Sequence, residues 1–173
     1  MHVRTKGRLA GVAFLVANAV MANAGPALVT ADPVIGHAAR DTHMNTAQRD
    51  ARNSLGAFLA AALDDTGTSL PDTGLKVAFQ TPAGLTEVIW IARFKQDGNG
   101  FTGHLANRPM HMDGAVGDPV SFDGGAIRDW FLIGDDGRMY GSFTTRAMLP
   151  ETSPEAVRSI QALLAPAPLP AGW

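Results

Sequence analysis

The chain of 173 residues contains no cysteine, which excludes disulfide bonds, thiol nucleophiles and cysteine metal ligands. It also lacks any run of five or six like charges, and its formal net charge is only −2 at pH 7. A charge that is weak and scattered argues against a broad surface for nucleic acid or an anionic membrane. The fold must therefore be held by packing alone, and we expect no cofactor.

Long hydrophobic runs are also missing, and the longest one lies near the start of the chain. Residues 9–21 are largely apolar, follow three basic side chains and precede Ala22-Asn23-Ala24. This order is typical of a secretory signal peptide, and the run is shorter than the roughly 20 apolar residues of a membrane-spanning helix. We expect cleavage after Ala24 and a periplasmic or secreted protein without a membrane span. An uncleaved anchor is the alternative.

The remaining 149 residues carry 11 basic and 16 acidic side chains and suit one domain. Residues 25–42 show no sustained hydrophobic period, so they are expected to form a flexible lead-in. Residues 166–173 are rich in proline, which prevents both a helix and a central strand. The single domain is therefore expected over residues 43–165, with a proline-rich tail after it.

Hydrophobic periodicity predicts an α+β fold. Apolar residues recur every three or four positions from Thr46 to Leu63, which indicates one amphipathic helix. From Leu75 the period changes to two, and the expected strands are 75–80, 87–94, 101–106, 120–122, 127–133 and 138–145. Ser153-Pro154 then begins a closing helix. We expect an N-terminal helix packed on an antiparallel meander of about six strands, with a short C-terminal helix.

Asp129 is the polar residue that is hardest to explain at a surface. Alternation along the strand 127–133 places its carboxylate among apolar side chains. A buried unpaired carboxylate costs several kcal/mol, so we expect a bond to Arg93, to Arg146 or to backbone amides of the loop 107–118. This favours an internal structural contact. The alternative is a carboxylate with a shifted pKa in a pocket.

Further polar and aromatic residues lie at strand ends and in loops, where binding residues often occur. Turn chemistry explains the loop residues equally well, and Trp90, Trp130 and Tyr140 are expected mainly in the core. The candidate binding residues are Glu87, Asn107, Arg108, Asp118, Asp129, Trp130 and Arg146.

No catalytic or metal-binding motif stands out. Ser142 lies in Gly-Ser-Phe-Thr and not in a Gly-x-Ser-x-Gly elbow, and no glycine-rich phosphate loop joins a strand to a helix. His104, His111, Asp113 and Asp118 match no familiar spacing of metal ligands. We therefore assign no catalytic residue and no metal ligand.

An ordered set of short motifs resembles the YegJ-like domain of unknown function found in bacteria. The set covers about residues 43–149 and consists of Met44-x-x-Ala47, Glu87-x-x-Trp90, Gly103-x-x-x-Asn107-x-Pro109, Gly117-Asp118-x-Val120, Ile127-x-Asp129-Trp130 and Thr144-Thr-Arg146. The resemblance agrees with export and implies little about activity, because it supplies no assigned catalytic residue to carry over. Two interpretations remain. One is a non-enzymatic module that binds an unknown periplasmic protein or small ligand. The other is a small hydrolase that uses Asp129 or Glu87 as general acid or base.

Overall fold

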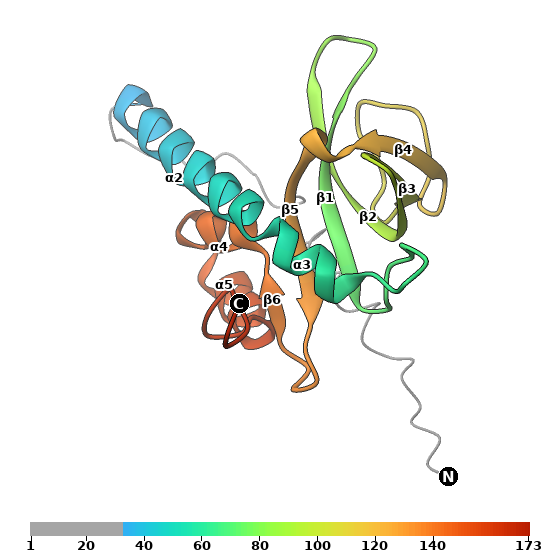
Figure 1. Ribbon diagram of the computed structural model, residues 1–173. Helices are drawn as coiled ribbons and strands as arrows, with labels where there is room; N and C mark the ends of the chain where they lie inside the picture. The colour runs from blue at the N-terminus through green and yellow to red at the C-terminus, as the bar shows by residue number, and fades with distance from the viewer. Residues whose placement is uncertain (1–32) are drawn as a thin grey trace.

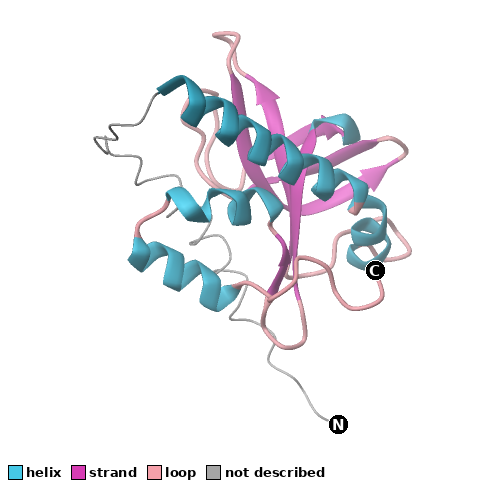
Figure 2. Ribbon diagram, turned by 90° about the vertical axis from the view of Figure 1, so that its left-hand side faces the viewer, coloured by secondary structure: helices cyan, strands magenta, loops and turns pink. Residues whose placement is uncertain are grey.

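The computed structural model describes the backbone of residues 33–173 and the side chains of residues 42–173. The expected signal peptide, and residues 25–32 of the expected lead-in, lie outside this part of the chain. Two helices, α2 (Pro33–Asn53) and α3 (Leu55–Ala62), follow one another across one face of a twisted sheet (Figures 1 and 2). Two more, α4 (Phe143–Met148) and α5 (Pro154–Leu163), lie near its last strand (Figure 1). No helix among the described residues is long and apolar enough to cross a membrane.

The first helical region is longer than predicted, and it is broken. It begins at Pro33 instead of near Thr46, so the later part of the expected lead-in is helical. The break falls at Ser54, whose hydroxyl donates to the carbonyl oxygens of Asp50 at 2.9 Å and Ala51 at 3.1 Å. Such bonds from serine back to the preceding turn bend helices. The single predicted helix is therefore two helices in sequence.

The six strands form one antiparallel sheet, which confirms the predicted fold class. They are β1 (Thr73–Gln80), β2 (Thr86–Asp97), β3 (Gly100–Leu105), β4 (Pro119–Asp123), β5 (Ile127–Ile133) and β6 (Met139–Gly141). Their spatial order is β4-β3-β2-β1-β5-β6. The first four strands make a meander, and the short 3-10 helix η1 (Gly124–Ala126) then leads the chain back so that β5 pairs with β1.

Two β-bulges interrupt the register of the sheet. The first bulge lies in β5. Lys76 pairs with Asp129 and the next residue, Val77, pairs with Ile127, so one residue of β5 is skipped between them. Strict alternation would put Ile127 on the same face as Asp129, but the extra residue moves Ile127 to the opposite face. The second bulge lies in β2 and contains Arg93, whose φ is +46°.

Each face of the sheet carries its own core. The larger core lies under α2 and α3, where the ring of Trp130 stacks on Phe58 with 4.7 Å between centroids. The Trp130 indole N–H donates to the Ala51 carbonyl at 3.1 Å, at the helix break. The smaller core on the second face contains Trp90, Phe131, Met139, Ile160 and Leu164. The predicted stripe of the first helix is confirmed, since Ala51, Phe58 and Ala62 are fully buried.

The last predicted strand is shorter than expected. It ends at Gly141, and residues 143–148 are helical because Ser142 turns the chain with a left-handed backbone, φ +53°. The closing helix α5 is confirmed, with the Ser153 hydroxyl accepting from the Ala156 amide at 3.4 Å. Residues 166–173 form no helix or strand, as predicted, yet they pack on the domain. Gly141 donates its amide to the Pro168 carbonyl at 2.7 Å.

Candidate functional site

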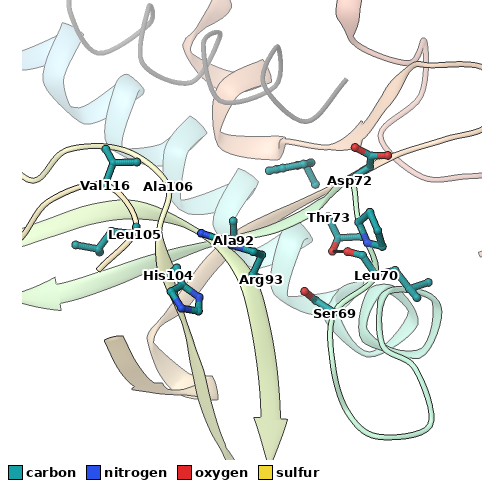
Figure 3. A pocket seen from close by; sticks show the side chains of 13 residues that line it. Ser69, Leu70, Asp72, Thr73, Ala92, Arg93, His104, Leu105, Ala106 and Val116 are labelled. Carbon is teal, nitrogen blue, oxygen red and sulfur yellow. Dashed lines mark hydrogen bonds between the residues drawn. The ribbon is translucent and has the colours of Figure 1, made fainter. Parts of the chain in front are cut away.

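A pocket of about 450 Å³ opens on the second face of the sheet (Figure 3). Its floor comes from β2, β3 and β5, and its walls come from the segment 69–73 and from the loop between β3 and β4. The lining residues are Ser69, Leu70, Pro71, Asp72, Thr73, Ala92, Arg93, His104, Leu105, Ala106, Val116, Gly117 and Phe131. The volume is within the range of about 300–1,000 Å³ that is usual for small-molecule sites.

Most of the pocket surface is apolar. Phe131 and Ala106 contribute to its floor, and Leu70 and Val116 lie at its two walls. Leu70 is 43% exposed and Val116 is 61% exposed, which is high for large aliphatic side chains. Apolar groups that gather around a concave site, instead of lying singly on the surface, are a feature of ligand-binding sites.

Three ionisable side chains line this largely apolar surface: Asp72, Arg93 and His104. Asp72 and Arg93 both have left-handed backbones, with φ of +64° and +46°. Within the described part of the chain, no hydrogen bond or ion pair holds the exposed Arg93 guanidinium. His104 Nδ1 is, among the described side chains, the one buried nitrogen or oxygen without a hydrogen-bond partner. The site therefore holds polar groups that the fold itself does not use.

Glu87, one of the predicted binding residues, holds the loop 107–118 against the sheet. Glu87 on β2 accepts from the amide of Met110 and, through Oε2, from the amides of His111 at 2.9 Å and Met112 at 3.1 Å. Three donors on one carboxylate fasten the loop to β2. Glu87 therefore has a structural partner for each of its oxygens.

Two other predicted residues act on the same loop. Asn107 Oδ1 accepts from the Trp90 amide at 2.8 Å, and Asp118 Oδ2 accepts from the Ala115 amide at 2.8 Å. Val116, which lies between these contacts, forms a wall of the pocket. The predicted polar residues thus position the wall without lining the pocket. Arg108 is exposed and does not line the pocket either.

Asp129 is fully buried, as its position in the strand predicted. Its expected partners were wrong, because it bonds neither an arginine nor the loop 107–118. Oδ1 accepts from the amides of Trp130 at 2.8 Å and Phe143 at 3.1 Å, and Oδ2 accepts from the amide and hydroxyl of Thr144 at 2.8 and 2.6 Å. These donors belong to Asp129's own strand and to the first turn of α4, which lies next to β5. The carboxylate is thus an internal contact.

Arg146 and Trp130 are also structural. The Arg146 guanidinium donates to the carbonyls of Gly141 at 2.9 Å, Ala165 at 2.9 Å and Met139 at 3.2 Å. These three bonds tie α4 to β6 and to the chain after α5. Burial lowers the pKa of Arg146, while the negative charge of Asp129 opposes this. Trp130 has no exposed surface and cannot contact a ligand in this conformation.

Lys76 is a buried residue that the sequence did not single out. Alternation in β1 placed it with Ala78 and Gln80, but it is only 6% exposed. Its Nζ donates to Thr144 Oγ1 at 3.0 Å and lies 5.5 Å from the centre of the Trp90 ring. Burial lowers the pKa of Lys76 and raises the pKa of Asp129, and the attraction between the two charges opposes both shifts. The pattern that could have indicated Lys76 is the pairing of opposite charges on adjacent strands, since Lys76 of β1 lies opposite Asp129 of β5.

The two carboxylates of the alternative hydrolase interpretation, Asp129 and Glu87, do not meet in a cleft. Neither Asp129 nor Glu87 lines the pocket, and no hydrogen-bond donor among the described residues is shared by the two carboxylates. Within residues 42–173, no group of three or more histidines and carboxylates is arranged to hold a metal ion. His104 lies on β3, apart from the loop that carries His111 and Asp113.

The fold and pocket together define a small α+β domain with a concave site on a sheet face. Residues 41–162 match the family described as an uncharacterized protein conserved in bacteria, DUF2314. The match spans more than half of the chain, so the protein belongs to this family. No curated protein and no solved structure was found to match it.

Proposed function

We propose that this DUF2314 domain is a non-enzymatic binding module that holds a small, largely apolar ligand in the pocket. The observation that carries the proposal is the contrast between two sets of polar groups. Glu87 and Asp129 have all their carboxylate oxygens bonded within the fold, whereas Arg93 and His104, which line the pocket, each carry a polar group that no described residue pairs with. Unpaired polar groups beside apolar walls are what fixes the orientation of a bound ligand.

The architecture around the pocket supports a preformed site. Bonds from Glu87, Asn107 and Asp118 hold the loop that carries Val116, so this wall is in place before a ligand arrives. A preformed wall reduces the loss of conformational entropy on binding. Glu87, Asn107 and Asp118 would therefore contribute to binding by holding this wall in place, although they do not line the pocket.

A hydrolase that uses Asp129 or Glu87 remains the alternative function. Such an enzyme needs two titratable groups that converge on one cleft. Asp129 has no exposed surface, and the Glu87 carboxylate accepts hydrogen bonds from three loop amides. Binding without chemistry fits this arrangement better.

A neutral fluorescent probe, N-phenyl-1-naphthylamine, tests the proposed pocket. We expect saturable binding to the full chain, seen as a rise in probe fluorescence. Val116→Asp should weaken this binding, because it places a charge on the pocket wall. Leu85→Asp is the matched control, since Leu85 is 53% exposed and does not line the pocket. Absence of saturable binding, or equal loss in both variants, would refute the proposal.

We further propose that the chain is exported and that it is of the YegJ-like subtype. The order of basic, apolar and small residues in positions 1–24 supports export to the periplasm or secretion. N-terminal sequencing of the fractionated protein should then give Gly25 as the first residue. An intact Met1 in the membrane fraction would instead mean an uncleaved anchor.

A further inference from the structure

We infer that the pocket takes an amphiphilic anion, with an apolar tail between Leu70 and Val116 and its negative head group at Arg93 and His104. The chemical class is a monocarboxylate, or a similar anion, that carries an aliphatic or aromatic tail. This inference rests on the proposed function, because it names the ligand of the same pocket.

Arg93 carries the first part of the argument. It lies in the β2 bulge with a left-handed backbone, which glycine adopts readily and arginine rarely does. A bulge of this kind re-aims a side chain relative to the regular pleat, and bulges are common beside active sites. Here the bulge makes Arg93 part of the pocket lining, while no described residue pairs with its charge. A guanidinium held in this way is suited to a carboxylate.

His104 carries the second part. His104 pairs with Ala92, the residue before Arg93, in the register of β2 and β3, so Arg93 and His104 occupy neighbouring positions in the floor of the pocket (Figure 3). Buried polar atoms without a partner are rare in folded proteins, and His104 Nδ1 is such an atom. An imidazole nitrogen can accept or donate a hydrogen bond according to its protonation. His104 is therefore the second ionisable side chain that we assign to the head-group site.

Asp72 sets where the negative head can lie. It lines the pocket from the segment before β1, on the other side from His104 (Figure 3). Its carboxylate would repel an anion placed against that wall and so favours the floor at Arg93 and His104. The tail is then left with the apolar surface of Leu70, Val116 and Phe131. The negative head group is thus placed beside Arg93 and His104, away from Asp72, and the tail lies on the apolar surface.

Displacement of N-phenyl-1-naphthylamine by three eight-carbon compounds tests the head group. Octanoate, octanol and octylamine share one tail and differ in charge at neutral pH. We expect octanoate to displace the probe at a concentration about tenfold lower than either of the others, as a charge-assisted contact would give. Equal displacement by all three, or tightest binding of octylamine, would overturn the inference. Saturable probe binding would still support the proposed pocket, so the two failures are distinguishable.

Substitution of Arg93 tests the residue itself. Arg93→Gln should weaken octanoate binding about tenfold and leave octanol binding unchanged, whereas Arg93→Lys should retain most of the preference. Arg158→Gln is the matched control, because Arg158 is an exposed arginine on α5 that does not line the pocket. The inference fails if Arg93→Gln binds octanoate like the wild type, or if Arg158→Gln weakens it equally.

Discussion

Asp129 and Thr144 are joined by two hydrogen bonds, because Asp129 Oδ2 accepts from both the amide and the hydroxyl of Thr144, at 2.8 and 2.6 Å. The first amides of a helix have no acceptor within the helix, so β5 supplies one to α4. Thr144 Oγ1 also accepts from Lys76 Nζ at 3.0 Å. One hydroxyl therefore lies between two buried charges and links the sheet to α4.

Asp129→Ala should lower the free energy of unfolding by about 3 kcal/mol or more. The substitution leaves the Lys76 ammonium without its nearby negative charge and the Thr144 hydroxyl and backbone amides without an acceptor. Urea denaturation of both proteins measures the difference. Asp123→Ala, at an exposed position in β4, is the matched control, with an expected change within about 0.5 kcal/mol. If Asp129→Ala were as stable as the wild type while ligand binding was lost, the structural role would be wrong.

The Lys76 and Asp129 side chains should be energetically coupled. Lys76→Met alone leaves the carboxylate without its cation, and Asp129→Asn alone leaves the ammonium without its anion. The double variant removes both charges, so its loss of stability should be smaller than the sum of the single losses by about 0.5–3 kcal/mol. Denaturant melts of the four proteins give this coupling energy. Additive losses would show that the two charges do not interact.

Sequence periodicity was sufficient for the elements but not for every boundary. The apolar stripe that includes Ala51 and Phe58 reflects a helix buried on one side, and the patterns of β1 and β2 reflect strands buried on one or both faces. These patterns predicted the fold class. At the break, the local bond from the Ser54 hydroxyl to the Ala51 carbonyl is joined by a tertiary bond from the Trp130 indole of β5 to the same carbonyl, which sequence periodicity does not reveal. The start of α4 likewise depends on Asp129, which lies more than a dozen residues earlier.

The candidate site was harder to predict for a physical reason. The motif residues Glu87, Asn107 and Asp118 hold a loop, so they mark the neighbourhood of the pocket without lining it. Arg93 lines it because it lies in the bulge that shifts the register between β2 and β3, next to Ala92, the partner of His104. A one-residue shift of this kind changes which side chains share a face, and sequence alternation alone does not reveal it.

Glu87→Ala should release the loop from β2. Loss of the carboxylate leaves the amides of residues 110–112 without their acceptor, so these amides should exchange with solvent faster. The free energy of unfolding should fall by about 1 kcal/mol, and probe binding should weaken because the wall that carries Val116 is no longer held. Asp113→Ala is the matched control, as an exposed acid in the same loop. Unchanged exchange at residues 110–112 would contradict this role of Glu87.

Asp64 should give the protein an acid-dependent part of its stability. Asp64 Oδ1 accepts from the Thr66 hydroxyl at 2.7 Å and from the amides of Thr66 and Thr68 at 2.9 and 3.0 Å. These bonds, the Thr66 hydroxyl first, lower the pKa of Asp64 below its ordinary 3.8. A carboxylate whose pKa is lower in the folded than in the unfolded state stabilises the fold at pH values above its unfolded pKa. This stabilisation is lost as the pH falls through the folded pKa.

The difference in unfolding free energy between wild type and Asp64→Ala measures this effect. It should be largest near neutral pH and should shrink as the pH falls from the unfolded pKa of about 4 through the lower folded value. Urea melts at a series of acidic pH values give the comparison. A difference that stays constant over this range would show that the bonds to Thr66 and Thr68 do not depend on the charge of Asp64.

Arg93→Gly should be more stable than Arg93→Ala by about 1 kcal/mol. Both substitutions remove the guanidinium, but only glycine adopts the left-handed backbone of this bulge without steric cost, and its greater freedom in the unfolded chain offsets part of the gain. Thermal or urea melts of the two variants isolate the backbone contribution. If Arg93→Gly also loses its preference for octanoate, the arginine is retained for its charge at the expense of stability. Equal stability of the two variants would mean that the bulge carries no strain, and the backbone of Arg93 would then be no sign of a functional site.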